Sequence, residues 1–371
     1  MKYFGKTVFI LGAGASVHQG APLLNDFLEK AHALSFSKGG LDNQESFDTL
    51  FKWLSELRAS NVAGFTDLRN LENVFSMISL LKETGDDFGK TLYAHMTKVI
   101  FETLERSILF SNQLPPTNSK LRDIGGSPTY AHFVHLVHAM NERRRLDLPK
   151  GKFQRDSFIT FNYDLLLERA LQVNDLTFTY HLEGDPPCDG YSVLKLHGSM
   201  NWYLHHDCKK PSTEGKSIRW YNMDESIMPR HGETRPGIVS FSKTRSQSCP
   251  DCQHGNAVLP VFIPPTWSKS AESARIGRIW AKALREIGSA NQLVVIGYSL
   301  PKTDTFFSYL MALGLKGNGD LKRVLLVDPN PELRGQYQTM FGSIPVEVNT
   351  DPLFKGRFEE LAPRLENFVY T

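Results

Sequence analysis

Short apolar runs that end in small or polar residues recur along this chain, and they constrain its fold more than any other feature. Phe158, Ile159 and Phe161 form one such run, which stops at Asn162 before a helical segment at 165–171. The other runs span residues 7–11, 193–196, 292–296, 324–327 and 346–348. Apolar strands that alternate with helices are typical of a parallel sheet covered on both faces, with ligands bound where strands end. The sequence therefore predicts a doubly wound α/β fold with one ligand crevice.

Length and composition allow a large core and more than one folding unit. With 371 residues, of which 41% are hydrophobic and 22% charged, two domains or one domain with a large insertion are expected. Residues 23–155 show helical spacing and no clear strand, whereas residues 203–266 are rich in turn residues. We expect a Rossmann-like parallel sheet from residues 1–22, 156–202 and 267–371, a helical insertion at 23–155, and a small cysteine-containing module at 203–266.

The charge balance and the lack of long apolar stretches narrow the class of protein. The formal charge is +2, from 42 basic and 40 acidic residues, so nothing draws the whole chain to nucleic acid or an anionic membrane. The chain contains no run of about 18 apolar residues, the length that a helix needs to span a bilayer. Its first residues lack the apolar stretch of a signal peptide. Four cysteines are too few for a disulfide scaffold. We expect a cytoplasmic protein with no membrane partner and no sequence-specific nucleic-acid binding.

A glycine turn follows the first apolar run. Gly12, Ala13, Gly14 and Ser16 stand where a nucleotide-binding unit places its phosphate loop, with a helix expected next to offer its amides. The dinucleotide fingerprint has a third glycine where Val17 stands, so the match is partial. The sequence leaves two interpretations open: a phosphate-binding turn and an ordinary tight strand–helix turn.

Polar residues at the later strand ends form a second candidate set. Asn162 and Asp164 follow one run and His197 follows the next, beside a glycine that permits close approach. An amide, a carboxylate and an imidazole at neighbouring strand ends favour a catalytic crevice. The alternative is structural, with Asp164 capping a helix and Asn162 forming a turn. The ends of the runs 292–296 and 324–327 add Gly297, Ser299 and Asn330 as candidate ligand contacts.

The segment 203–266 carries three of the four cysteines. Cys249 and Cys252 have the two-residue spacing of a zinc knuckle, and His205 with Cys208 has matching spacing. These four residues predict a structural zinc site, although the halves are farther apart than in a compact ribbon. Two alternatives remain: cysteines without a joint role, and a redox dithiol.

The order of these strand ends resembles that of the sirtuin family. The matching segments are Gly12–Ser16 with Gly20 and Pro22 for the first NAD-binding loop, Thr160–Asp164 for the Thr-Gln-Asn-Ile-Asp motif, Leu196–Gly198 for the catalytic histidine, Gly297–Leu300 for the Gly-Thr-Ser motif, and Asp328–Asn330 for the late ribose-binding strand end. The cysteine-bearing segment corresponds to the family's zinc module. The resemblance implies NAD as the ligand, and it covers the sheet but not the helical insertion.

One departure bears on the activity. The deacylating sirtuins carry Asp-Phe-Arg after the Gly-x-Pro, and here residues 23–25 are Leu-Leu-Asn. The chain looks closer to the bacterial sirtuin-like proteins of anti-phage defence, and this resemblance implies hydrolysis of NAD+ to nicotinamide and ADP-ribose. Because depletion of NAD is toxic and no sensor domain is evident, we expect control by self-assembly into a homo-oligomer or by a separate partner, and the resemblance points to a ring ATPase of the HerA type as that partner.

The chemistry of the bond assigns a role to each candidate residue. Loss of the cationic nicotinamide leaves an oxocarbenium-like centre, as in glycoside cleavage. Asn162 would position water, His197 would take the proton or bind the ribose hydroxyls, and Asp164 would bind the carboxamide. Turn amides at 12–16 would hold the pyrophosphate, while Ser299 and Asn330 would contact the adenosine ribose. The alternatives are a protein deacylase or ADP-ribosyltransferase, and an NAD or ADP-ribose sensor without turnover.

Overall fold

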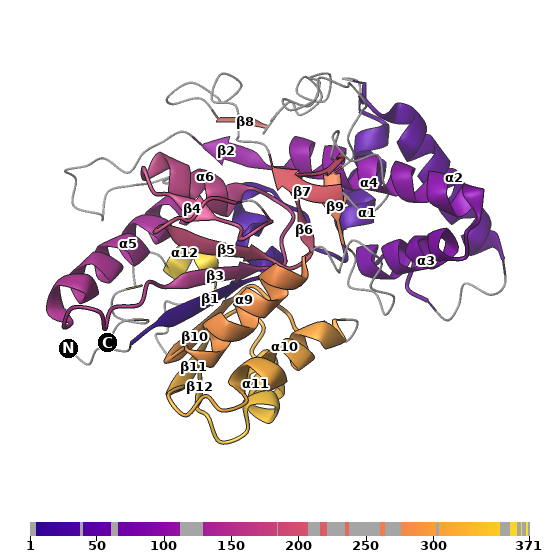
Figure 1. The fold of residues 1–371 in the computed structure, drawn as a ribbon. Helices are drawn as coiled ribbons and strands as arrows, with labels where there is room; N and C mark the ends of the chain where they lie inside the picture. Colours follow the sequence, from indigo (N-terminus) through magenta and orange to yellow (C-terminus); the bar gives the residue numbers. More distant parts are fainter. Residues whose placement is uncertain are drawn as a thin grey trace.

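A seven-stranded parallel sheet forms the centre of the protein (Figure 1). Its order is β12-β11-β10-β1-β3-β5-β4, so the strands on either side of β1 come from different halves of the chain. The strands are β1 (Thr7–Leu11), β3 (Ser157–Thr160), β4 (Phe178–Thr179), β5 (Tyr191–Lys195), β10 (Gln292–Ile296), β11 (Arg323–Val327) and β12 (Val346–Val348). The predicted Rossmann-like parallel sheet is confirmed, and β1 marks the point where such sheets open a ligand crevice.

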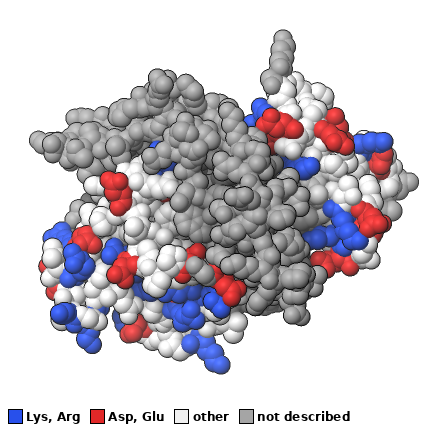
Figure 2. Space-filling view, turned by 45° about the horizontal axis from the view of Figure 1, so that its top comes forward, with Lys and Arg blue, Asp and Glu red and all other residues white. Residues whose placement is uncertain are grey.

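The structure is a computed structural model. It describes residues 5–37, 40–60, 66–111, 129–183, 185–206, 216–220, 234–236, 260–263, 276–301, 304–348, 357–361, 365 and 369. Among the described helices, none combines the length and the apolar character that crossing a membrane requires. On the face shown in Figure 2, the described basic and acidic side chains are interspersed.

Helices cover both faces of the sheet because successive residues of a strand point to opposite sides. On one face, α5 (Thr129–Asp147) packs beside α6 (Leu166–Val173), and its Phe133 ring lies 5.2 Å from that of Phe9. On the other face, α9 (Gly277–Gly288) is tied to the start of β1, since Lys6 Nζ lies 2.5 Å from Glu286 Oε2. Next to α9 lies α10 (Thr305–Leu315), while α11 (Leu333–Phe341) follows β11.

A helical lobe lies beyond the carboxyl ends of the strands (Figure 1). This helical lobe consists of α1 (Phe27–Ser35), α2 (Gln44–Ala59), α3 (Leu71–Glu83) and α4 (Asp87–Ser107). Asn70 and Asp86 cap α3 and α4 with side-chain oxygens. The predicted helical insertion is confirmed, and its buried apolar residues belong to the same hydrophobic cluster as those of the sheet.

The expectation of no strand before residue 156 is wrong. Leu109–Ser111 forms β2, which pairs antiparallel with β8 (Thr234–Pro236). A run of three residues is too short to show a periodic pattern, and its pairing depends on a distant partner.

A small antiparallel sheet joins the two sides of the segment expected to form a separate module. β6 (Gly198–His206) pairs with β7 (Lys216–Trp220) and with β9 (Pro260–Phe262). β6 begins directly after the strand end that carries His197. The domain limits given above stay a prediction.

Candidate functional site

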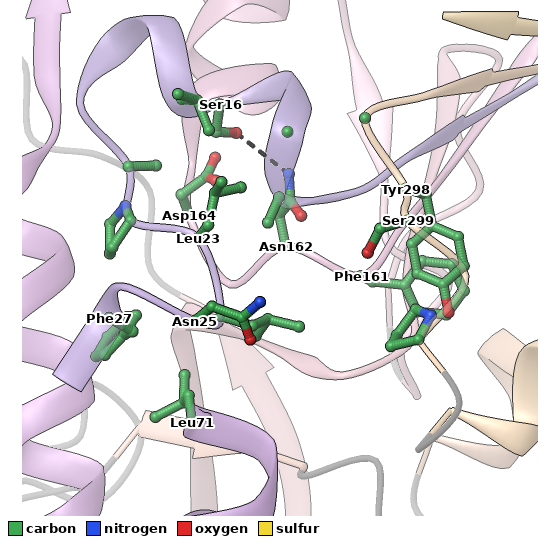
Figure 3. Close-up of a pocket in the computed structure, with 18 of the residues that line it drawn as sticks. Ser16, Leu23, Asn25, Phe27, Leu71, Phe161, Asn162, Asp164, Tyr298 and Ser299 are labelled. Carbon is green, nitrogen blue, oxygen red and sulfur yellow. Dashed lines mark hydrogen bonds between the residues drawn. The ribbon is translucent and has the colours of Figure 1, made fainter. Parts of the chain in front are cut away.

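A pocket of about 720 Å³ opens at the carboxyl edge of the parallel sheet. The ends of β1, β3, β5, β10 and β11 contribute to it on one side, and the helical lobe on the other. In Figure 3, Phe27 and Leu71 of the helical lobe lie across the cavity from Asn162 and Asp164. Cavities of this size are typical of small-molecule and cofactor sites.

The glycine turn after β1 is built differently from the expected strand–turn–helix. Two short 3-10 turns, Ala13–Ala15 and Val17–Gln19, follow β1, and the first α-helix begins only at Phe27. The expected helix N-terminus is therefore absent at this place among the described residues. Four turn amides, those of Gly12, Gly14, Ala15 and Ser16, donate to protein carbonyl oxygens.

The glycines of this turn allow two loops to approach closely. Gly14 N donates to Gly297 O at 2.9 Å, which joins the loop after β1 to the loop after β10. A Cβ atom on Gly12 would lie 2.5 Å from Gly297 O, and one on Gly14 would lie 2.7 Å from Gly297 Cα. Packing between the two loops therefore requires glycine here whether or not a phosphate binds.

Asn162 is held in a fixed orientation at the end of β3. Its Nδ2 donates to Gly12 O at 2.8 Å and to Ser16 Oγ at 3.2 Å, and the latter bond is drawn in Figure 3. Ser16 Oγ in turn lies 3.1 Å from the Tyr130 hydroxyl. Because Nδ2 is used in this way, Oδ1 is the atom of the amide that is left to accept a hydrogen bond from water or a ligand.

Asp164 has both a structural contact and a place in the pocket lining. Its Oδ1 accepts from Leu166 N at 3.0 Å, but the N-cap of α6 is Leu165, so Asp164 is not the capping residue that the structural alternative expected. The side chain is 5% exposed and lines the cavity. The backbone oxygen of Asp164 accepts a hydrogen bond from Lys195 Nζ, which also pairs with Glu168 Oε1 at 2.9 Å. This buried pair fixes the loop between β3 and α6.

His197 lies between β5 and β6, on the same pocket as Asn162. Its carbonyl oxygen accepts from Ile263 N at 2.8 Å, and its ring meets Phe161 edge-on with centroids 5.1 Å apart. Its Nε2 lies 3.8 Å from Asp304 Oδ2. An imidazole next to a buried carboxylate is an arrangement that orients the ring for proton transfer.

The structure brings most of the predicted site residues together. The pocket lining includes Ala13, Gly14, Ser16, Asn162, Asp164, His197, Gly297 and Ser299, and Gly12 accepts the Asn162 amide. Asn330 is exposed and lies outside this lining; its Oδ1 accepts from Glu332 N at 3.0 Å. From the same strand end, Asp328 and Pro329 line the pocket instead.

The predicted zinc ligands fall outside what the structure describes. The backbone of His205 lies in β6 opposite Ser217, but its side chain is not described, and neither are Cys208, Cys249 and Cys252. Within the described part of the chain, no three His, Cys, Asp or Glu side chains form a group suited to a metal ion. The zinc site stays a prediction.

Several charged lining residues were not foreseen from the sequence as site residues. The described lining holds one Lys or Arg side chain, Arg357, against four carboxylates, which belong to Glu72, Asp164, Asp328 and Glu359. Arg357 directly precedes α12 (Phe358–Leu361). Since Phe358 lies 5.6 Å from the His18 ring, Arg357 belongs to the end of the pocket near the glycine turn.

Burial shifts the pKa of several lining side chains. It lowers the pKa of His18, against the opposing charges of Glu359 and Asp164, and so favours a neutral ring. Burial raises the pKa of the Asp328 carboxyl. Burial, together with the carboxylates of Glu72 and Asp304, also raises the pKa of Tyr163 far above its usual value, which keeps this phenol protonated.

No protein-family model and no curated protein matches the chain. A structure solved for the mechanism and regulation of Sir2 enzymes matches at 16% identity and a TM-score of 0.40, over 98% of this chain and 94% of that chain. A Sir2 homologue in complex with NAD matches at 16% identity and a TM-score of 0.39, over 98% and 88%. A structure on sirtuin substrate affinity matches at 15% identity and a TM-score of 0.39, over 98% and 93%. The strand order described above establishes the fold independently of these matches.

Proposed function

We propose that the protein is an NAD+ hydrolase that releases nicotinamide and ADP-ribose. The observation that carries this proposal is the meeting of Asn162 and His197 in one pocket beside the glycine turn. The pocket volume of about 720 Å³ suits a ligand of dinucleotide size. The motif resemblance to NAD-binding proteins supports the choice of ligand.

The proposed reaction breaks the bond between the nicotinamide nitrogen and the anomeric carbon. The bonding electron pair leaves with nicotinamide, which becomes neutral, and water adds its oxygen to the anomeric carbon. Asn162 Oδ1 accepts a hydrogen bond from this water, while the His197 imidazole takes its proton or holds the ribose hydroxyls. Asp164 binds the carboxamide of nicotinamide.

Arg357 is proposed as the partner of the pyrophosphate. The turn amides are mostly bonded within the protein, and the first α-helix begins too late to offer its N-terminus. A dinucleotide bound in a pocket lined by four carboxylates needs a nearby cation for its phosphates. Among the described lining residues, Arg357 carries such a charge. Ser299 is proposed to contact the adenosine ribose.

The segment that departs from the deacylating pattern supports hydrolysis over acyl transfer. Leu23, Leu24 and Asn25 line the pocket without any charge. Leu71 N donates to Leu24 O at 3.0 Å, and Asn70 Nδ2 donates to Asn25 Oδ1 at 2.9 Å, so α3 fixes this segment. Incubation with NAD+ and acyl-lysine peptides, followed by mass spectrometry, separates the two activities: deacylated or ADP-ribosylated peptide would contradict simple hydrolysis.

The decisive test is purified protein with NAD+, with the products separated by chromatography. Nicotinamide and ADP-ribose are expected in equal amounts. Asn162→Ala and His197→Ala should each lower the rate by about 10² to 10⁴-fold. Thermal melting checks that both variants fold, since Asn162 also ties down Ser16. Full activity in folded variants would contradict the assignment, and tight binding of NAD+ without nicotinamide release would favour a sensor.

We also propose that this hydrolase acts in anti-phage defence, as part of a homo-oligomer or with a HerA-type ATPase. The support is the motif resemblance to bacterial defence proteins. Phage should form fewer plaques on cells that carry the wild-type gene with its neighbouring genes than on cells that carry the His197→Ala variant. Light scattering on the purified protein tests self-assembly, and a monomer at micromolar concentration would contradict it.

A further inference from the structure

Glu72 is a buried carboxylate that the helical lobe contributes to the pocket. It lies in the first turn of α3, it is 6% exposed, and it lines the cavity. Removing a carboxylate from water costs free energy, and interactions of Glu72 with its surroundings offset part of this cost. The proposed reaction uses Asn162 and His197 but gives this carboxylate no role.

Contacts of Phe75 connect α3, the helix that carries Glu72, to β9. The ring of Phe75, one turn farther along α3, lies 5.4 Å from that of Tyr93. The Tyr93 hydroxyl donates to Phe262 O at 3.1 Å, and the Phe262 ring lies 4.7 Å from that of Tyr163. These contacts connect α3 through Tyr93 and β9 to Tyr163, the residue after Asn162.

The charge of Glu72 acts on the His197 end of this pocket. Burial is the main cause that raises the pKa values of Tyr163 and Tyr298, and the carboxylate of Glu72 adds to both shifts. The Tyr298 hydroxyl bonds Asp304, whose carboxylate lies 3.8 Å from His197. The Tyr163 ring, which packs on Phe262, lies 6.5 Å from the His197 ring, so α3 and its Glu72 border the His197 end of the pocket, whereas Arg357 lies near the glycine turn.

We propose that Glu72 is a further catalytic residue, whose carboxylate stabilises the positive charge that develops on the ribose of NAD+. This inference rests on the hydrolysis proposed above. As the bond to nicotinamide breaks, its electron pair neutralises the pyridinium ring, and the positive charge moves to the anomeric carbon and the ribose ring oxygen. A fixed carboxylate beside these atoms interacts more strongly with the transition state than with bound NAD+. Glu72 forms no covalent bond, and the proton of the attacking water goes to His197 or to solvent.

The test compares three variants on α3. Glu72→Gln keeps the shape and removes the charge, Glu72→Asp keeps the charge, and Glu83→Gln makes the same change at an exposed position of the helix outside the pocket lining. Glu72→Gln should lower kcat by about 10²-fold, whereas its Kd for ADP-ribose should change by less than about twofold. Glu72→Asp should recover part of kcat, and Glu83→Gln should match the wild type.

Two results would overturn the inference about Glu72 while leaving the hydrolysis intact. One is an unchanged kcat in Glu72→Gln, and the other is loss of ADP-ribose binding in parallel with kcat, which would indicate a structural role. Wild-type protein that binds NAD+ but releases no nicotinamide would instead overturn the proposed function, and the role of Glu72 with it.

Discussion

Asp304 lies behind His197, with its Oδ2 3.8 Å from the imidazole Nε2. The same oxygen accepts from the Tyr298 hydroxyl at 2.5 Å, and Oδ1 accepts from Phe307 N at 3.2 Å. One carboxylate, 3% exposed, therefore joins the loop after β10, the start of α10 and the strand end after β5. This geometry suits a residue that positions His197 rather than one that meets the substrate.

Asp304→Asn should lower kcat for nicotinamide release by about tenfold or more, with a smaller change in KM. The amide oxygen can still cap α10, but the charge beside His197 is lost. Asp86→Asn is the matched control, because Asp86 caps α4 by accepting from Gly89 N at 2.9 Å and lies outside the pocket lining. Equal kcat values for Asp304→Asn and the wild type would show that Asp304 serves α10 alone.

Arg357→Gln should weaken ADP-ribose binding by about tenfold, as expected for the loss of a charge-assisted contact to phosphate. Isothermal titration measures the Kd. Adenosine, which carries no phosphate, should bind both proteins alike. Arg334→Gln is the control, since Arg334 is exposed on α11 and is not part of the pocket lining. A parallel loss of adenosine binding would indicate that Arg357 shapes the pocket without contacting phosphate.

Much of the candidate site could be predicted because its residues follow local patterns. Asn162 and His197 each come directly after an apolar run, and the carboxyl ends of parallel strands share one edge of a sheet. Knowledge of the strands alone was therefore enough to predict that these two side chains lie on one pocket.

Other site residues gave no such signal. Glu72 is an acidic residue in the first turn of a helix, where its charge interacts favourably with the helix dipole. Asp304 is the N-cap of the next helix after β10. Both descriptions hold in the structure, and neither marks the residue as part of a site. Their positions in or beside the pocket depend on how the helical lobe and α10 pack against the sheet, which no local pattern encodes.

The glycine turn shows how a local pattern can have a second physical cause. A phosphate-binding turn and an ordinary tight turn were both open for Gly12 and Gly14, and the close approach to Gly297 requires glycine in either case. Gly297 lies far from Gly12 and Gly14 in the sequence, so a local pattern does not reveal this contact. The same segment forms 3-10 turns in place of the expected helix.

Gly297→Ala should destabilise the protein well beyond the ordinary cost of a glycine replacement. Gly297 has a φ of +59°, and an added Cβ would lie 2.3 Å from Ala15 N. Gly85→Ala is the control, because Gly85 has a φ of +84° with nothing within 4 Å of its added Cβ. The control should cost about 1 kcal/mol, and overpacking at Gly297 should add about 1–3 kcal/mol. Urea denaturation measures both; equal losses would mean that the two loops separate easily.

The stability of the protein should fall as the pH drops below about 6.5, the ordinary pKa of histidine. Burial lowers the pKa of His18 in the folded protein, so the unfolded chain binds the proton more readily at acidic pH. Above that pH, His18 is neutral in both the folded and the unfolded state, so its burial costs no stability. Below it, His18 lowers the free energy of unfolding by up to about 1.4 kcal/mol per pH unit. Urea denaturation at pH 7.5 and 5.5 should show a smaller decrease for His18→Gln than for the wild type. Burial also lowers the pKa values of His132 and His181, so some decrease should remain. Identical decreases in the two proteins would show that His18 is protonated without opposition from the fold.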